Sequence, residues 1–207
     1  MASVLLPEGV AFGLRGDANY SSVTDEIILT TTAKFQSGTA MSGARIDLSQ
    51  DFNISFDVFL GTSDADADGL GFVLHDSPDG VNAIGAAGSG MAFGNIQDGL
   101  AIEFDTFNSA PHQIFSGGPD IANDHTGFVD TDGAFGSTPV DLGNIEDGQW
   151  HSVTVNWNAS THTLSYTFDG QQAGSSTVIS CLTISAGRIL PISVSPPQPA
   201  EKSMSKR

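Results

Sequence analysis

Basic side chains are almost absent from the central part of this sequence. No Lys or Arg occurs between Ile46 and Gly187, and the whole chain has 7 of them against 24 Asp and Glu, a formal net charge of −17. Such a surface repels phosphate backbones and anionic headgroups. The composition therefore argues against nucleic acid and membrane lipid as partners. It favours bound cations, or a salty medium that screens the self-repulsion.

Three further absences narrow the class of protein. Cys181 is the single cysteine, so a disulfide framework is excluded, and a lone cysteine is most often a small buried hydrophobe. No apolar run approaches the roughly 20 residues of a membrane-spanning helix. The start, "MASVLLPEGV", lacks the basic residues and long apolar core of a signal peptide. We therefore expect a secreted or cell-surface protein whose signal has been removed, or a module of a larger multidomain protein.

Helical periodicity is also absent, and alternation of apolar and polar residues takes its place. It occurs in "NISFDVFL" (53–60), "HSVTVNWN" (151–158) and "TLSYTFDG" (163–170), and a short turn joins the last two into a hairpin. "GLGFVLH" (69–75) is apolar on both faces, as in a strand buried on both sides. These patterns predict an all-β fold, an antiparallel β-sandwich.

The end of the chain departs from this pattern. The segment after Ser180 contains three prolines between 196 and 199 and four of the seven basic residues. We expect a domain over residues 1–180. Residues 181–207 would form a partly disordered tail, either a linker or a segment foreign to the domain.

An apparent calcium motif, Asp64-Ala-Asp66-Ala-Asp68-Gly, precedes the strand at 69–75. It fails as a helix–loop–helix calcium loop, because His75 stands where a bidentate Glu is required. Asp64 and Asp66 are therefore interpreted as solvated turn residues.

The strongest candidate site lies in "GLAIEFDTFNS" (99–109) and "PDIANDHTGF" (119–128). Glu103 and Asp105 are two residues apart on a strand, so both project from the face opposite the core. Asp120 and His125 follow from a loop. Neighbouring carboxylates repel unless a cation or a proton neutralises them, and oxygens with one imidazole suit Ca²⁺ together with a transition metal such as Mn²⁺. The residues alone leave a solvated acidic edge as an open alternative.

These motifs resemble the legume-type (L-type) lectins, whose fold is a concanavalin A-like sandwich, or jelly roll. "EFDTF" followed by Asp120 and His125 resembles the metal loop of that family, and "ADGLGFVLH", "AAGSGMAFGN" and "DGQWHSVTVNWNASTHTLSYTFDG" resemble other segments in the same order. The resemblance covers residues 10 to 175 and is to bacterial rather than plant members of the family.

The resemblance implies the site residues and their roles. The transition metal would be held by Glu103, Asp105, Asp120 and His125, and Ca²⁺ by Asp105, Asp120, the Phe107 carbonyl and an Asn side chain. This sequence departs from the family because Ser109 stands at the Asn position and Asn108 comes one residue early; Asp124 is a rival ligand.

The same resemblance implies a carbohydrate site beside the metals. Asp68 would accept hydroxyl groups of the sugar, the glycine-rich loop Gly88-Ser89-Gly90 would donate a backbone N–H, and Asn108 would donate its amide. Phe115 is the one candidate for an aromatic that stacks on the sugar.

Glycans or glycoconjugates are therefore the expected partners, in a binding protein that attaches to surfaces rather than an enzyme. A sandwich-fold glycoside hydrolase would need a second Glu where Phe107 stands. A laminin-G-like adhesion module shares "DGQWHSV" but does not predict the acidic set with His125.

Overall fold

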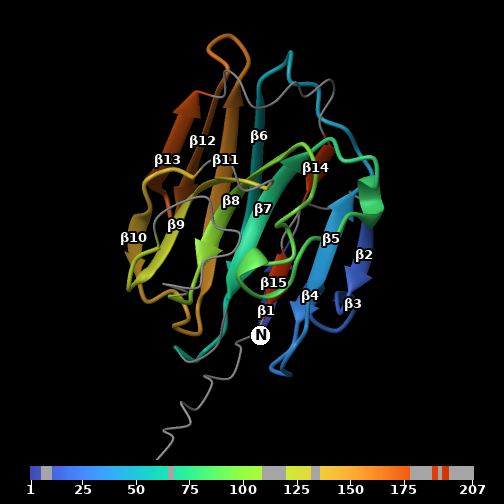
Figure 1. The fold of residues 1–207 in the computed structure, drawn as a ribbon, viewed down its shortest axis with the longest axis vertical. Helices are drawn as coiled ribbons and strands as arrows, with labels where there is room; N and C mark the ends of the chain where they lie inside the picture. The colour runs from blue at the N-terminus through green and yellow to red at the C-terminus, as the bar shows by residue number, and fades with distance from the viewer. Residues whose placement is uncertain are drawn as a thin grey trace, which may run out of the picture.

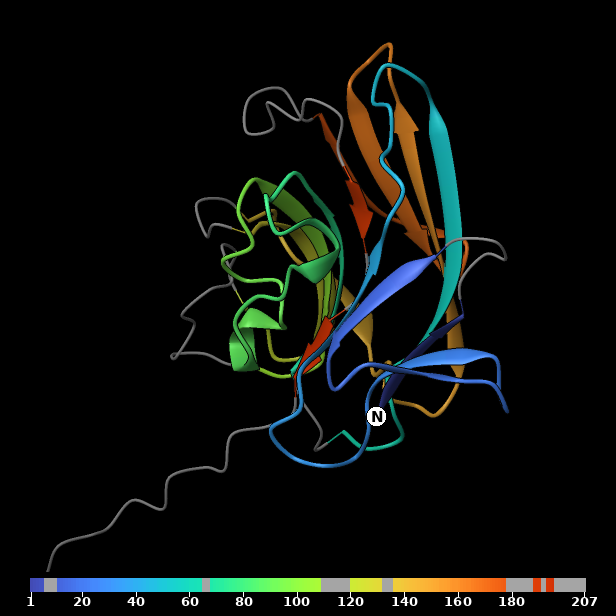
Figure 2. The same ribbon diagram turned by 90° about the vertical axis from the view of Figure 1, so that its right-hand side faces the viewer.

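A computed structural model of the chain describes residues 1–5, 11–64, 68–108, 120–131, 136–177, 188–190 and 193–195. Its strands form two antiparallel sheets that face each other (Figure 1 and Figure 2). The predicted all-β antiparallel sandwich is confirmed. Among the described residues, the only helical segments are two single turns of 3-10 helix, Gly80–Asn82 (η1) and Gly88–Gly90 (η2).

The first sheet has seven strands. In the spatial order β13–β12–β11–β6–β1–β4–β3 they are Gln171–Thr177, Thr163–Phe168, Trp150–Asn158, Phe52–Phe59, Ala2–Leu5, Glu26–Thr30 and Asn19–Ser21.

The second sheet has eight strands. In the order β10–β9–β8–β7–β15–β5–β2 they are Val140–Gly143, Asp124–Asp130, Gly99–Asp105, Gly69–His75, Ser193–Ser195, Gly38–Ser42 and Phe12–Gly16, and β14 (Arg188–Leu190) also pairs with β7.

Apolar side chains at alternate positions of the strands fill the space between the two sheets. Phe56 of β6 stacks on Phe72 of β7 across the sandwich, with ring centroids 5.6 Å apart. Tyr166 of β12 meets the edges of Phe104 and Phe128 from β8 and β9. Because β-branched and aromatic side chains of both sheets interdigitate here, this layer is the main hydrophobic core.

A second apolar cluster covers the outer face of the 8-stranded sheet. The connection between β7 and β8, which contains η1 and η2, folds over that face (Figure 2). Its Met91, Phe93 and Ile96 pack on Val73 and Ala101 of the sheet. The predicted burial of β7 on both faces is therefore confirmed: the core lies on one side and this loop on the other.

Two short strands near the end of the chain belong to the 8-stranded sheet. β14 pairs with β7, and β15 lies between β7 and β5. The sequence had assigned both segments to the tail. Cys181 and the residues after 195 lie outside the described part of the chain. The boundary at residue 180 and the disorder of the tail stay predictions.

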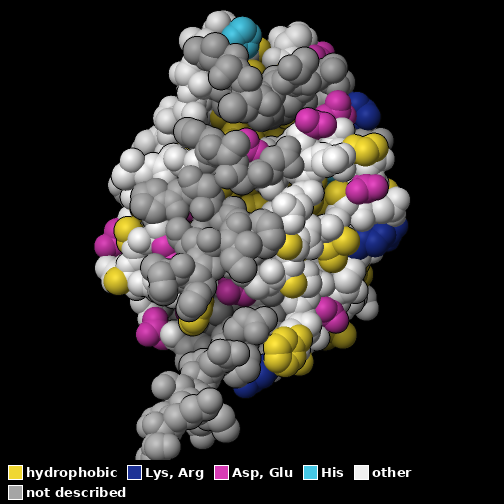
Figure 3. Space-filling model, viewed as in Figure 1, with side chains coloured by type: hydrophobic (Ala, Val, Ile, Leu, Met, Phe, Trp, Pro, Cys, Tyr) yellow, Lys and Arg dark blue, Asp and Glu magenta, His cyan; other side chains and the backbone are white. Residues whose placement is uncertain are grey.

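Charge is unevenly distributed over the face shown in Figure 3. Its Lys and Arg side chains lie on the side that carries β2, β4 and β5, whereas Asp and Glu occur on both sides. Arg15, Lys34 and Arg45 are the basic residues of the described ranges apart from the one in β14. The strands β8, β9 and β10, at one end of the 8-stranded sheet, therefore carry acidic residues and no Lys or Arg.

Gly71 is predicted to be required for the docking of the β7–β8 connection. A Cβ at this position would lie 2.4 Å from the buried Phe93 ring, so Gly71→Ala forces the loop off the sheet. Overpacking of this kind costs about 1–3 kcal/mol of unfolding free energy, measurable by urea denaturation. Gly43→Ala is the matched control, because its Cβ would meet only the Ala11 oxygen at 3.9 Å. Equal stability of the two variants would contradict the packing described.

Candidate functional site

The outer face of β8 carries the two carboxylates that the sequence predicted. Ile102 and Phe104 belong to the core between the sheets, so the alternating residues Glu103 and Asp105 project from the opposite face. Both are buried, although they face away from the core. On the neighbouring strand β9, His125 is the register partner of Asp105. Strand pairing thus places three of the four predicted transition-metal ligands on one face of the sheet. Among the described residues, the acidic or histidine ligand atoms that all lie within 4.8 Å of one another are those of a different group, Asp64, Asp124 and Glu146.

Glycines of the flanking strands leave room around these carboxylates. Gly127 of β9 and Gly71 of β7 are the register partners of Glu103, and Gly69 is that of Asp105. A Cβ at Gly127 would lie only 3.6 Å from Glu103 Oε1. Glu103 is therefore flanked by a glycine on each neighbouring strand, and Asp105 is flanked by Gly69 on one side and by His125 on the other.

Asp68 and Asp120 complete an acidic group around Asp105. Asp68 directly precedes β7, and its carbonyl accepts a hydrogen bond of 3.2 Å from the Thr106 N–H. The pKa of Asp105 is raised to about 8, chiefly by burial and also by the charges of Glu103, Asp120 and Asp68, against the lowering effect of the Phe107 N–H. Four carboxylates thus lie close enough to repel one another.

Glu103 shows the same effect, because burial and, to a smaller extent, the nearby charge of Asp120 together raise its pKa to about 8. Its Oε2 is buried and has no hydrogen-bond partner within the part of the chain that the structure describes. A buried carboxylate oxygen left in this way costs free energy unless an ion or a proton satisfies it. The Glu103 carboxylate therefore fits a cation.

His125 is oriented for the same purpose. Its Nδ1 lies 3.1 Å from the Asn123 carbonyl oxygen, which can only accept, so Nδ1 carries the proton. The lone pair is then on Nε2, the arrangement usual in metal-binding histidines. Oxygen ligands with one imidazole suit a transition metal, and the carboxylates around Asp105 suit Ca²⁺.

The remaining predicted residues surround this acidic group unevenly. Phe107 and Asn108 follow β8 and are exposed; the Phe107 N–H donates to Asp105 Oδ1 at 2.8 Å. The glycine-rich loop Gly88–Gly90 forms η2, and Met91 directly after it approaches Gly69, the neighbour of Asp68. Ser109 and Phe115 lie outside the described residues, so their roles stay predictions.

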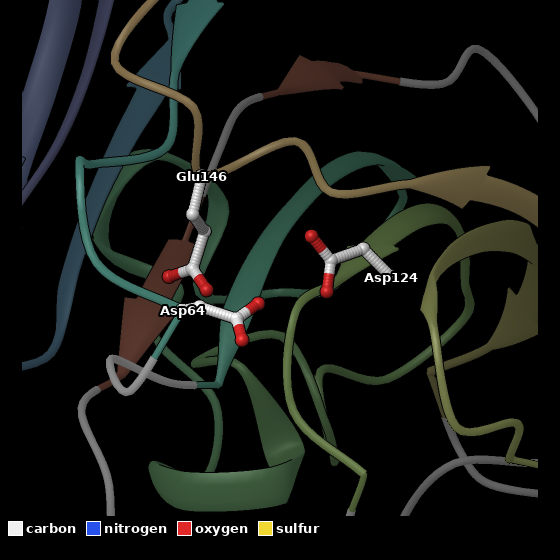
Figure 4. Close-up of side chains that lie close together, drawn as sticks. All are labelled: Asp64, Asp124 and Glu146. Atoms are coloured by element: carbon white, nitrogen blue, oxygen red, sulfur yellow. The ribbon is translucent and has the colours of Figure 1, made fainter.

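A second acidic cluster was not recognised as a unit from the sequence. Asp64, Asp124 and Glu146 each offer an oxygen within 4.8 Å of the others, and their carboxylates point toward one another in Figure 4. Asp124 alternates with His125 along β9, so it lies with this cluster and not with Glu103. Burial raises the pKa of Asp124, which the Ile145 N–H partly offsets and the Asp64 charge increases.

This geometry revises two sequence-based interpretations. Asp64, interpreted as a solvated turn residue, is exposed but belongs to a cluster whose other members are buried. Asp124, regarded as a rival ligand for the His125 site, faces elsewhere. The alternation of side chains along 124–130 already indicates that Asp124 and His125 project from opposite faces of the strand. Glu146 lies between strands, where no alternation of apolar and polar residues indicates which way its side chain projects.

The fold and the site together define a concanavalin A-like sandwich with an acidic, histidine-containing centre beside β8. Comparison with known families gives the finer assignment. The family model described as the legume lectin beta-barrel domain matches residues 9–190, so the chain belongs to the L-type lectin family.

One curated protein is similar to the chain in sequence, and solved lectin structures are similar to it in fold. The pesticidal crystal protein Cry22Aa of Bacillus thuringiensis is 28% identical over 164 residues, which are 72% of this chain but 22% of that protein. The chain therefore spans about a fifth of the length of this relative. Lectin II from Ulex europaeus has a TM-score of 0.72 at 18% identity, covering 94% of this chain and 89% of the lectin. The lectin from Bauhinia forficata in complex with GalNAc has a TM-score of 0.70 at 16% identity, covering 96% and 92%.

We predict that the cation-free protein loses stability as the pH rises. The pKa values of Glu103 and Asp105 rise from 4.5 and 3.8 to about 8 on folding. Stabilisation by their protons is complete below the unfolded values and is lost as the pH passes through the folded ones. Thermal melts in EDTA should therefore give a falling Tm between about pH 4 and 8.

Variants that remove the charges of Glu103 and Asp105 distinguish the titration of these two residues from the repulsion among all the acidic residues of the chain. Glu103→Gln combined with Asp105→Asn should flatten the pH dependence, whereas the exposed Asp79→Asn should leave it unchanged. A wild-type Tm that rises over this range would contradict the burial of the two carboxylates.

Proposed function

We propose that this chain is a carbohydrate-binding lectin module whose binding loops are organised by Ca²⁺ and a transition metal such as Mn²⁺. The observation that carries the proposal is the buried Glu103 Oε2, which has no hydrogen-bond partner among the described residues and stands in a group of carboxylates beside His125. Membership of the L-type lectin family supports this reading over a laminin-G-like adhesion module or a hydrolase.

Side chains of this acidic group would hold two cations. Glu103, Asp105, Asp120 and His125 would hold the transition metal. Asp105 and Asp120 would also hold Ca²⁺, with the Phe107 carbonyl and the Asn108 or Ser109 side chain. When bound, the ions would supply the positive charge that the buried carboxylates lack.

The sugar would bind beside the ions, at Asp68. This carboxylate is buried and its own carbonyl is anchored to the Thr106 N–H, so its position depends on the segment that follows β8. Asp68 would accept two sugar hydroxyls, while the amide of Asn108 and a backbone N–H of the Gly88-Ser89-Gly90 turn donate. Each hydroxyl both donates and accepts, so this mixture of groups is what a sugar requires. The GalNAc held by the Bauhinia forficata lectin supports glycans as the ligand class.

Glycans as the proposed ligands also bear on where the protein acts. We propose a secreted or surface-exposed bacterial module that attaches to glycans without cleaving them. The greater length of the Cry22Aa relative supports a larger multidomain parent. No helix among the described residues is long and apolar enough to cross a membrane.

Asp68→Ala should abolish glycan binding and leave the fold intact. Central polar residues of a binding site commonly contribute about 2 kcal/mol or more, so affinity should fall at least about 30-fold. The Tm should not fall, because the charge of Asp68 raises the pKa of Asp105 and its removal relieves repulsion. A glycan array with Ca²⁺ and Mn²⁺, followed by titration calorimetry on the best glycan, measures the loss. Asp79→Ala removes an equal charge from an exposed turn and should bind normally; unchanged binding by Asp68→Ala would refute the assignment.

Removal of the cations should lower both the Tm and glycan binding. An ion present at 100 times its Kd stabilises the folded state by about 2.7 kcal/mol, which corresponds to a Tm shift of about 5–10 °C for a chain of this size. EDTA should produce this shift, and Ca²⁺ with Mn²⁺ should reverse it. If neither the Tm nor binding responds, the cations have no role here.

A further inference from the structure

A shallow trough lies at the far end of the molecule from the acidic site. Its volume is about 730 Å³, and it is lined by the start of β6, the end of β11, the turn after β11 and the start of β12. In Figure 1 the β11–β12 connection lies at the top of the view, whereas the connection from β6 towards β7 lies at the bottom. The eight residues of β6 therefore separate the trough from Asp68 by roughly 20–25 Å.

The lining is polar and nearly uncharged. Three asparagines and several hydroxyl side chains alternate with core residues along the strands, so they form the outer surface of the 7-stranded sheet. Asp51 is the single charged residue of the lining, and Phe52 and Trp157 supply its aromatic part.

Internal hydrogen bonds fix these groups while leaving donors available. Asn53 Nδ2 donates to Asn156 Oδ1 at 2.6 Å, and the Thr161 N–H donates to Asn158 Oδ1 at 3.0 Å. The amide oxygens of Asn156 and Asn158 are thus used internally, and the Nδ2 groups of both have no partner among the described residues. The Ala159 N–H occupies only one oxygen of Asp51.

Strand register makes the arrangement rigid. Asn53 lies opposite Asn156, and Asn156 lies opposite Ser165. Phe52 stacks on Trp157, whose ring is held by a hydrogen bond of 2.9 Å from its Nε1 to the Leu48 carbonyl. A site with positioned donors and acceptors loses little entropy when it binds a ligand.

We propose that this trough is a second carbohydrate-binding site, which takes a short neutral oligosaccharide. Free amide N–H groups, one carboxylate oxygen and hydroxyl groups match the mixed donors and acceptors of sugar hydroxyls. Phe52 and Trp157 face the core beneath this surface and support the strands that carry the polar groups. The volume is that of a small-molecule site. The negative charge of Asp51 disfavours glycans that carry carboxylates or sulfates, because no basic residue between Ile46 and Gly187 offsets it.

The experiment uses the full chain with Asp68→Ala, so that the first proposed site is silent, in Ca²⁺ and diamagnetic Zn²⁺. Lactose, maltotriose, mannotriose and chitotriose are titrated into ¹⁵N-labelled protein, and amide shifts are followed by NMR. At least one of these sugars should give saturable shifts at Asn156, Asn158 and Thr163. Addition of a sialic acid to lactose should not strengthen binding.

Ser165→Arg fills the trough without removing a hydrogen bond found in the structure, and it should raise the Kd at least about tenfold. Ser152→Arg, exposed on the same face of β11 but outside the trough, is the matched control. Absence of saturable shifts with all four sugars overturns the proposal, as do shifts that persist in Ser165→Arg. Shifts that follow protein concentration instead of sugar identify a self-association surface and also overturn it.

The test of the trough does not depend on whether a sugar binds at Asp68. Shifts near Asp68 and Gly88–Gly90 in the wild type, without shifts in the trough, support the proposed function alone. Shifts in the trough of Asp68→Ala support the second site even if the first fails.

Discussion

Repulsion among buried carboxylates is the constraint on which the candidate site depends. Glu103 and Asp105 lie on one face of β8 with Asp68 and Asp120 close by, and the chain has no basic residue between Ile46 and Gly187 to neutralise them. The raised pKa values of Glu103 and Asp105 express this cost: without cations, the folded protein holds protons that the unfolded chain releases. Divalent cations therefore compete with protons for the same oxygens. In the proposed lectin, the charge around Asp68 would then depend on which of them is bound.

The sandwich tolerates this cost because its core does not depend on the acidic face. The inner side of the same strands is filled by Phe104 and Phe128, which pack against Tyr166 of the opposite sheet. A polar link joins the two sides: Thr126 Oγ1 donates to the Glu103 carbonyl and lies 3.0 Å from the Tyr166 hydroxyl. The core thus fixes the backbone of the strand that carries Glu103. The backbone position of Glu103 is therefore set by the core and does not depend on whether its carboxylate is neutralised.

The sequence predicted the strands and the direction of Glu103 and Asp105, because both follow from a period of two with a hydrophobic core on one side. The placement of Asp120 and His125 beside them depended on resemblance to a family, since the intervening loop has no periodicity. Asp64, Asp124 and Glu146 were missed as a unit because their segments are distant in sequence and meet only through tertiary packing. Strands β14 and β15 were missed for a related reason: each has three residues, too few to show alternation, and they are stabilised by pairing with β7 and β5.

Two carbohydrate sites at opposite ends of one sandwich would differ in what controls them. The proposed site at Asp68 would rest on loops ordered by cations, so its affinity would follow the concentration of free ion and the pH. The trough rests on paired strands and on hydrogen bonds among their side chains, so the concentration of free ion should not change its affinity. Shallow polar sites bind weakly one at a time, and simultaneous occupation by a multivalent surface multiplies their affinities through effective concentration. Because the trough lies on the outer face of the 7-stranded sheet and Asp68 lies beyond the other end of β6, one glycan chain would not readily reach both. A single domain would then connect two glycan chains, and withdrawal of the cation would release one of them while the other stays bound.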